Sequence, residues 1–255
     1  DDPAREQWLQ RTISEAGPQL GHVRDVVLGN ARVARHSLVL DVKAGTGLLT
    51  WEALRQVPEG GVTALVANHR DGEALRQLAE RLPELERPDV RNGLPEQLSD
   101  ILKESPDIRF NAIVGRNVLF DQPDKPGVIA ALRPWLADGG RISLAERVGR
   151  HTQRLYDLIE LSGMDAALVE KIKAAEEAIY TDPENPQLNW AADDLVALFE
   201  DSGFAVDWRT EDELKPTWIG LSSSSVSQST ANPLSTNRAT RSSAAQLSFG
   251  FSGSV

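Results

Sequence analysis

The residues with the clearest chemical potential are an acidic residue and a glycine-rich turn that follow a short apolar run. The run Leu38 to Val42 contains Asp41, and Gly45 and Gly47 come directly after it. Glycine after a strand lets the backbone approach a ligand closely. The helix predicted to follow presents free backbone N–H groups in its first turn. This pattern predicts a ligand site built largely from main chain.

A dinucleotide-binding fingerprint is one interpretation of this turn. That fingerprint requires a third glycine in the pattern Gly-x-Gly-x-x-Gly. Thr50 stands three residues after Gly47, where the third glycine would be. The dinucleotide interpretation is therefore incomplete.

Other polar residues follow later predicted strands or lie in a later helical block. Arg116 and Asn117 follow one apolar run, Glu146 ends another, and His151 and Tyr156 come after it. Such side chains could orient a nucleophile or accept a proton, and histidine has a suitable unperturbed pKa. Each also has a structural interpretation: a surface charge for Arg116, a cap or ion-pair partner for Glu146, and an exposed polar group for His151. We therefore assign no catalytic residue from the sequence.

Short apolar runs alternate with segments of helical periodicity through the first part of the chain. This alternation is typical of βαβ units, so we expect an α/β fold. The expected architecture is a doubly wound, mostly parallel sheet of Rossmann-like type, with ligands at the carboxyl ends of its strands. The predicted strands are 37–42, 62–67, 88–90, 110–115 and 141–146, and the predicted helices are 48–57, 71–82, 95–104 and 124–136. Asp71 is the expected N-cap of its helix.

The chain divides into a core and several additions. Helices are expected at 4–16 and 20–28, and a helical insertion packed over the strand ends is expected after Glu146. A helix from Asn189, a strand at 203–208 and a last strand at 217–219 complete the core, whose edge is expected to be incomplete. We expect the following parts: N-terminal helices in 1–30, a Rossmann-like core in 31–148, a helical insertion in 149–188, the end of the core in 189–221, and a tail in 222–255.

The tail differs sharply in composition from the rest of the chain. Residues 222–255 contain 12 serines and no lysine, aspartate or glutamate. A segment with so little apolar surface does not offset the entropy of ordering. We therefore expect the tail to be disordered.

Composition excludes several function classes. There is no cysteine, so thiolate zinc sites, iron–sulfur clusters and cysteine nucleophiles are excluded. With 27 Lys and Arg against 38 Asp and Glu, the formal charge is −11, which disfavours direct nucleic-acid binding. The four histidines are far apart, so no metal site is expected. No apolar run approaches a membrane span, so we expect a soluble, cytoplasmic protein without membrane partners. Asp1 in place of an initiator methionine suggests a processed or excised piece.

The glycine turn resembles the first motif of the class I S-adenosylmethionine-dependent methyltransferases. That motif has an acidic residue at a strand end and then a Gly-x-Gly-x-Gly turn, similar to Asp41, Gly45 and Gly47 here. Segments similar to later elements of that family are 110–119, 132–142 and 194–204. The resemblance covers roughly residues 30–148 and 189–210 in matching order. It implies the Rossmann-like methyltransferase fold and S-adenosylmethionine as cofactor.

The sequence departs from the family pattern at three places. Lys43 replaces the first glycine of the turn and could pair with a cofactor carboxylate, pair with Asp41, or fill the pocket. Asn68, followed by His69, stands near the place of an acidic residue that binds the ribose hydroxyls. An amide carries no charge, so cofactor affinity should fall. Asn111 replaces a common aspartate in the fourth strand.

The resemblance implies both a set of cofactor-contacting residues and a mechanism. Methyl transfer mainly requires that the acceptor be aligned with the methyl group and that water be excluded. The acceptor is expected to be a small molecule or a protein, with residues 151–188 helping to form its pocket. The residues implied to line the cofactor are Asp41, Lys43, Ala44, Gly45, Thr46, Gly47, Asn68, His69, Asn92, Gly93, Arg116 and Asn117.

A second, fainter resemblance concerns the context of the domain. Segments 49–55 and 151–156 are similar to a methyltransferase-like region fused behind a bacterial AAA+ replication-associated recombination ATPase. The nucleotide-binding loop of such an ATPase does not occur in this sequence. The second hypothesis is therefore a non-catalytic interaction module of a larger DNA-maintenance protein, with a fusion or partner domain.

Overall fold

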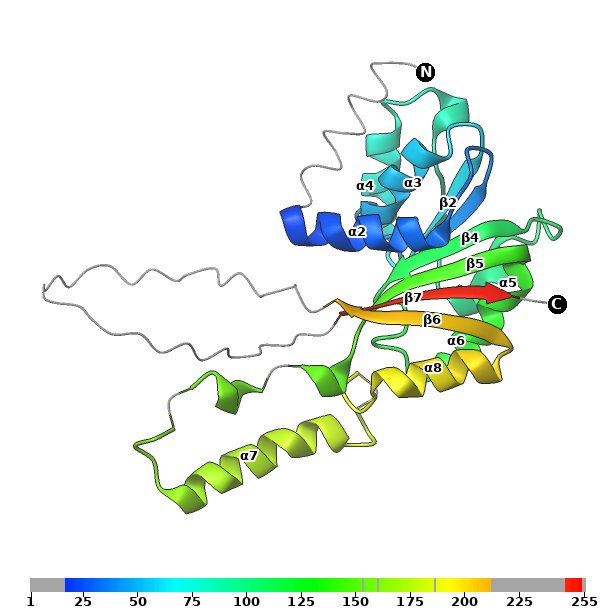
Figure 1. The fold of residues 1–255 in the computed structure, drawn as a ribbon. Helices are drawn as coiled ribbons and strands as arrows, with labels where there is room; N and C mark the ends of the chain where they lie inside the picture. The colour runs from blue at the N-terminus through cyan, green and yellow to red at the C-terminus, as the bar shows by residue number, and fades with distance from the viewer. Residues whose placement is uncertain (1–16, 153, 160, 186, 212–245, 254–255) are drawn as a thin grey trace, which may run out of the picture.

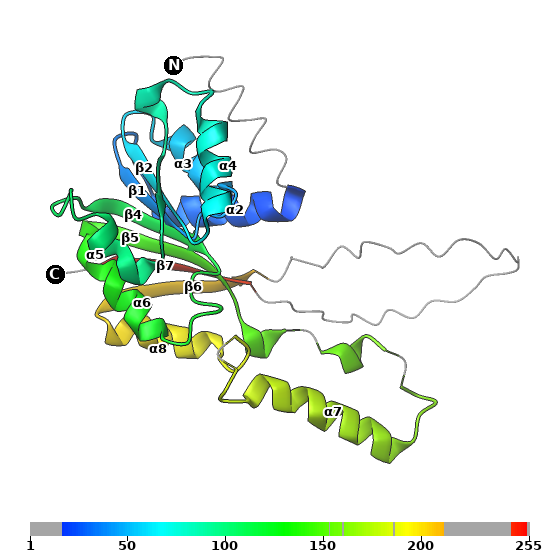
Figure 2. The same ribbon diagram turned by 180° about the vertical axis from the view of Figure 1, so that it is seen from behind.

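A computed structural model describes residues 17–211, apart from 153, 160 and 186, together with residues 246–253. The helix predicted at 4–16, the strand predicted at 217–219 and most of the serine-rich tail lie outside the described residues. Within them, the chain forms one sheet covered by helices on both faces, as Figures 1 and 2 show.

The sheet has the order β3-β2-β1-β4-β5-β7-β6. Its first five strands are parallel to one another, and β7 runs antiparallel to both β5 and β6. The strands are β1 (Leu38–Val42), β2 (Gly61–Val66), β3 (Asp89–Asn92), β4 (Phe110–Arg116), β5 (Leu136–Arg147), β6 (Phe204–Glu211) and β7 (Gln246–Gly253). The predicted doubly wound, mostly parallel sheet is confirmed. Because the order reverses between β1 and β4, the carboxyl ends of these strands are where the fold forms a crevice.

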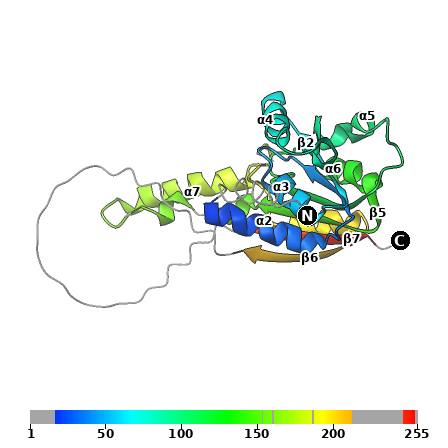
Figure 3. The same ribbon diagram turned by 90° about the horizontal axis from the view of Figure 1, so that it is seen from above.

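Residues of the central strands alternate between two apolar cores, one on each face of the sheet. Val39 and Val114 pack with α2 (Gly17–Ala31), α3 (Leu48–Gln56) and α4 (His69–Ala79). Leu40 and Ile113 pack on the opposite face with α5 (Leu98–Ile101), α6 (Lys125–Leu132) and α8 (Ala192–Asp201). The two helical layers are visible in Figure 1, and Figure 3 looks down on α2 and α3 where they lie over the sheet. Strands buried on both faces explain why the sequence shows continuous apolar runs.

Several predicted helices differ from the observed ones at their ends. The N-cap of α4 is Asn68, whose side-chain oxygen accepts from the backbone N–H of Asp71 at 2.8 Å, so the prediction of Asp71 as the cap was wrong. The helix predicted over 95–104 is a 3₁₀ turn (Pro95–Gln97) followed by the short α5. The helix predicted over 124–136 ends as α6 at Leu132, with a 3₁₀ turn at Pro134.

Part of the tail is a strand, which corrects the expectation of disorder over all of 222–255. Residues 246–253 form β7 and pair along their length with β5 on one side and β6 on the other. The sequence had suggested an incomplete sheet edge, and this expectation was wrong because β7 and β6 complete the sheet. The composition of the tail hid a local alternation of Leu247, Phe249 and Phe251, which has the period of a strand. The pairing of β7 satisfies backbone groups of both neighbouring strands.

The predicted insertion forms α7 (Ala166–Thr181) and the short 3₁₀ turns Gly149–His151 and Leu155–Asp157. Figures 1 and 2 show α7 extending away from the sheet, so the insertion does not cover the strand ends as expected. Arg154 joins its two parts: its Nε donates to Glu177 at 2.7 Å, and its guanidinium lies 3.7 Å from the ring centroid of Tyr180. Glu176 accepts backbone hydrogen bonds from Leu155 and from the residue after it.

Candidate functional site

The turn between β1 and α3 is held by backbone hydrogen bonds and by two glycine conformations. The N–H of Gly47 donates to the carbonyl of Ala44 at 2.9 Å, and Ala44 donates to Leu65 on β2 at 2.9 Å. Gly47 has φ 90°, and a Cβ there would lie 2.5 Å from Nε1 of Trp51. Gly45 also has a positive φ, with open space beside it. The turn therefore needs glycine at Gly47 for two reasons, conformation and packing.

Asp41 lies under this turn, with its side chain buried. Its Oδ2 accepts a hydrogen bond from the hydroxyl of Thr50 at 2.7 Å, while Oδ1 has no partner among the described residues. Burial is the largest influence on this carboxyl and raises its pKa to about 7, although the bonds from Thr50 oppose the shift. Asp41 is thus a buried acid that keeps one open acceptor oxygen.

A cavity of about 260 Å³ opens beside the turn. It contains Asp41 in its wall, the residues of the glycine turn, the first residues of α3, and one residue each from α2 and β4. The N-cap residue of α3 is Gly47, which has no side chain to cap the helix. The lining residues are Leu20, Asp41, Lys43, Ala44, Gly45, Thr46, Leu48, Leu49 and Arg116. Six of the residues that the resemblance implies for the cofactor, Asp41, Lys43, Ala44, Gly45, Thr46 and Arg116, are together in this wall.

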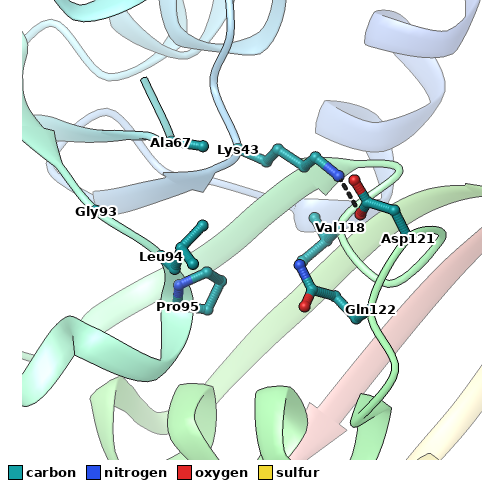
Figure 4. Close-up of a pocket in the computed structure, with 8 residues that line it drawn as sticks. All are labelled: Lys43, Ala67, Gly93, Leu94, Pro95, Val118, Asp121 and Gln122. Carbon is teal, nitrogen blue, oxygen red and sulfur yellow. Dashed lines mark hydrogen bonds and ion pairs between the residues drawn. The ribbon is translucent and has the colours of Figure 1, made fainter. Parts of the chain in front are cut away.

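A second cavity, of about 80 Å³, is shown in Figure 4. It lies between the ends of β1 and β2, the turn after β3 and the loop after β4. Its lining residues are Lys43, Ala67, Gly93, Leu94, Pro95, Val118, Asp121 and Gln122. Lys43 lines both cavities. Sites for small ligands usually enclose about 300 Å³ or more, so neither cavity reaches that size alone.

The side chain of Lys43 crosses from the turn to the loop after β4 (Figure 4). Its Nζ donates to the carbonyl of Asn117 at 2.7 Å and lies 2.5 Å from Oδ1 of Asp121. Lys43 is a non-glycine residue with φ 73°, a left-handed conformation that favours the glycine it replaces. Of the three roles considered for it, pairing with Asp41 is not observed. Its partner Asp121 was not predicted from the sequence. The only signal for it was an acidic residue five positions after the end of the fourth strand.

Glu146 holds the loop after β4 through its buried side chain. Its buried Oε1 accepts from the backbone N–H groups of Val118 at 2.7 Å and Leu119 at 3.2 Å. Burial raises the pKa of Glu146 to about 7, against the lowering effect of these bonds and of nearby lysines. Asn117, with φ 52°, accepts from the backbone N–H of Arg147 through its side chain at 3.1 Å. Glu146 and Asn117 thus position the loop that holds Asp121.

The second strand ends differently from the family pattern. Its last residue is the buried, apolar Val66, and the side chain of Asn68 is used to cap α4, where its Nδ2 also donates to Asp71 at 2.7 Å. His69 is the exposed first residue of that helix. Neither Asn68 nor His69 lines the two cavities described. Asn68 therefore stands where the family pattern has an acidic residue, and the carboxylate of Asp71 beside it is bonded to the Asn68 side chain.

Asn92 and Gly93, two predicted cofactor residues at the end of β3, have different roles. Oδ1 of Asn92 accepts from the guanidinium of Arg76 at 3.3 Å, which links β3 to α4. Gly93 lines the smaller cavity, and its N–H donates to the carbonyl of Val66 at 2.9 Å. Gly93 has φ 149°, a conformation that favours glycine, and a Cβ there would lie 2.4 Å from the terminal Cδ1 of Ile101.

Three other residues singled out in the sequence lie away from the cavities. Asn111 is at the amino end of β4, where its side chain accepts from Leu38 N–H at 2.8 Å, so its departure from the family pattern does not bear on the site. His151 is exposed in the insertion. The Tyr156 hydroxyl donates to Glu177 at 2.6 Å, a bond that raises the pKa of Tyr156 to about 12. No described residue of 149–188 is in either lining, and the expectation that residues 151–188 help to form an acceptor pocket stays a prediction.

Comparison with solved structures identifies the fold. A SAM-dependent methyltransferase of Methanosarcina mazei is 15% identical with a TM-score of 0.52, over 89% of this chain and 96% of that one. The chain has the class I methyltransferase fold. The mycolic acid cyclopropane synthase CmaA1, complexed with SAH and CTAB, is 18% identical with a TM-score of 0.53, over 75% of this chain and 63% of that one. The [4+2]-cyclase SpnF is 19% identical with a TM-score of 0.54, over 75% of this chain and 59% of that one.

This chain thus spans less than two thirds of the length of the synthase and the cyclase. No family model matches the sequence, and no curated protein matches it. The predicted link to an AAA+ ATPase stays a prediction. In the part of the chain that the structure describes, no cluster of three histidine or acidic residues could hold a metal. The helices of that part are also too short or too polar to span a membrane.

Proposed function

We propose that this protein is an S-adenosylmethionine-dependent methyltransferase. The observation that carries the proposal is the cavity of about 260 Å³ at the glycine turn, at the carboxyl ends of β1 and β4, where this fold has its ligand crevice. Fold alone does not fix a reaction, since a cyclopropane synthase and a cyclase share this one. The site supports the proposal through its turn and its buried acid.

The residues fit one end of S-adenosylmethionine better than the other. At the turn, the open oxygen of Asp41 and the uncapped start of α3 offer an acceptor and backbone donors to the amino-acid part. The smaller cavity, with Gly93 and Pro95, would hold the nucleoside part. There, Asn68 replaces the acidic residue that the family uses to bind the ribose, so contacts from backbone and apolar groups must suffice. The bound cofactor would supply an electrophilic methyl group.

The chain's own residues would then orient the ligand and exclude water. The loop after β4 forms one wall of the smaller cavity, and Glu146 holds it by two backbone hydrogen bonds. Lys43 must yield space, because its side chain lines both cavities and each is smaller than the ligand. A shift of the Lys43–Asp121 pair would join the two cavities into one of suitable size. We further propose that the acceptor is a small molecule or a protein and that the reaction takes place in the cytoplasm.

Calorimetric titration with S-adenosylhomocysteine, the demethylated product, tests this proposal. We expect saturable binding that is weaker than in a site with a ribose carboxylate. The matched control is Gly47→Ala, in which the added Cβ would distort the turn and should abolish binding. If the wild-type protein shows no binding at millimolar ligand, the proposal is rejected.

A further inference from the structure

Two arginines lie at the carboxyl ends of neighbouring central strands, and neither forms an ion pair with another residue that the structure describes. Arg116 ends β4, and Arg147 ends β5. In the register of these strands Arg116 is opposite Ala145, so Arg147 is two residues farther along on the same face. The backbone N–H of Arg147 donates to the side chain of Asn117 at 3.1 Å, which fixes its strand next to the end of β4.

The two guanidinium groups are exposed to solvent to different extents. Arg116 is half-buried in the wall of the larger cavity, and its Nε is buried with no hydrogen-bond partner among the described residues. Arg147 is exposed, and its guanidinium lies 5.3 Å from the ring centroid of Phe120. A buried donor without a partner costs free energy, and the cost is larger for a charged group. A ligand that accepts from Arg116 would recover that cost.

The electrostatic surroundings of Arg116 also favour an anion. Burial lowers the pKa of Arg116, and the positive charge of Arg147 lowers it further, while Glu146 opposes both effects. The Oε1 of Glu146 accepts hydrogen bonds from the loop backbone and not from either arginine. The other nearby cation, Lys43, is already neutralised by Asp121. Two cations on neighbouring strands, without an ion pair in the described part of the chain, are a local exception in a protein of net charge −11.

We propose that Arg116, in the wall of the larger cavity, and Arg147, at the end of the neighbouring strand, form an oxyanion-binding site that takes a carboxylate or phosphate group of the ligand. The planar fork of an arginine suits such groups because it can donate two parallel hydrogen bonds. The uncapped N-terminus of α3 opens on the same cavity and adds backbone N–H donors of the right polarity. Leu20 and Leu48 line the rest of the wall, so the anionic group is joined to an apolar part.

The anion has two sources that the proposed function allows. It is either the carboxylate of the cofactor's amino-acid part or an anionic group on the acceptor. The site itself does not depend on methyl transfer, because it is defined by the two arginines and can be probed with inorganic phosphate alone. Failure of the proposed function and failure of this site are therefore separate results.

The test follows the Nε–H signal of Arg116 by ¹H–¹⁵N NMR in the whole protein at constant ionic strength. The signal is assigned by its loss in Arg116→Lys. We expect inorganic phosphate to shift the signal saturably. Phosphate affinity, followed through backbone amide shifts of the α3 N-terminus, should fall by about 10-fold or more in Arg116→Gln, since a hydrogen bond to a charged group contributes about 1.5–3 kcal/mol. In the exposed Arg147→Gln the loss should be about threefold.

Arg141→Gln is the matched control, because Arg141 lies on β5 as Arg147 does but at the far end of the pairing with β4. Its phosphate affinity should equal that of the wild type. The site is rejected if the phosphate shift is linear without saturation, or if Arg141→Gln weakens binding as much as Arg116→Gln. Far-ultraviolet circular dichroism and Arg116→Lys, which keeps the charge and should retain part of the affinity, separate loss of the site from loss of the fold.

Two further ligands identify the source of the anion. If S-adenosylhomocysteine displaces phosphate and methylthioadenosine, which lacks the amino-acid part, does not, the site holds the cofactor carboxylate. If phosphate still binds in the presence of S-adenosylhomocysteine, the site holds the acceptor. Saturable phosphate binding with no binding of S-adenosylhomocysteine supports the site and rejects the proposed methyltransferase.

Discussion

Lys43 and Asp121, separated by 78 residues in the sequence, form an ion pair of 2.5 Å across the two cavities. The pair is half exposed, with 32% and 44% of the two side chains accessible, so it contributes little to stability. Its position matters more than its strength, because it occupies the space between the glycine turn and the loop after β4 (Figure 4). The same ammonium group also holds the carbonyl of Asn117.

Replacing Lys43 by glycine should open the site. We expect Lys43→Gly to bind S-adenosylhomocysteine about tenfold more tightly, equivalent to about 1.4 kcal/mol. The free energy of unfolding should change by less than about 1 kcal/mol, since glycine accepts the positive φ that lysine adopts with strain. Calorimetry and urea unfolding measure the two quantities.

Asp121→Asn distinguishes two roles of Lys43: obstruction of the cofactor site and an ion pair with the cofactor carboxylate. This variant keeps the bulk of the lysine but releases its charge. If Lys43 instead binds the cofactor carboxylate, affinity should rise in Asp121→Asn and fall in Lys43→Gly. That pair of results would contradict obstruction.

Burial of Asp41 predicts a specific pH dependence of stability. Its pKa is raised to about 7 from an ordinary value of 3.8, so the folded protein holds this proton more tightly than the unfolded chain. Stability from this group is present below the unfolded pKa, is lost as pH rises toward the folded pKa, and is constant above it. Asp41→Asn, which can still accept from Thr50, should therefore gain stability relative to wild type as pH rises. Urea unfolding at about pH 4, 6 and 8 measures this difference. A difference that does not change with pH would contradict it.

The two glycines of the turn should differ in their tolerance of alanine. Gly47→Ala places a Cβ at 2.5 Å from Nε1 of Trp51 and 2.6 Å from Cδ2 of Leu75, so we expect a loss of about 2 kcal/mol or more in the free energy of unfolding. In Gly45→Ala the new Cβ meets only Lys43 O at 4.0 Å, and only the conformational cost of about 1 kcal/mol remains. Equal losses in thermal or urea unfolding would show that packing around Gly47 adjusts freely.

Asn68 should act as a helix cap and not as a ribose ligand. Asn68→Ala should cost about 1 kcal/mol of stability, the usual loss for an N-cap. Asn68→Asp keeps the cap and adds a carboxylate. We expect both variants to bind S-adenosylhomocysteine as the wild type does. A marked increase in affinity in Asn68→Asp alone would restore the sequence prediction that this residue faces the ribose.

The sequence by itself determined the alternation of strands and helices, the parallel sheet and the glycine turn around Asp41. These features depend on local periodicity and on the conformational freedom of glycine, which neighbouring residues encode. Asn68 shows the limit of this reasoning, because its position in the chain fits a ligand role and its side chain is used by the helix that begins beside it.

Only the tertiary structure decided which side chains meet at the strand ends. The partner of Lys43, the backbone groups held by Glu146 and the neighbouring guanidinium groups of Arg116 and Arg147 all involve residues that are distant in sequence. The strand β7 was also not predictable from local sequence, because it forms by pairing with the free edges of β5 and β6. Such contacts depend on how the sheet is assembled. Neighbouring strand ends bring together charged side chains from distant parts of the sequence, and a local sequence pattern does not predict which of them pair.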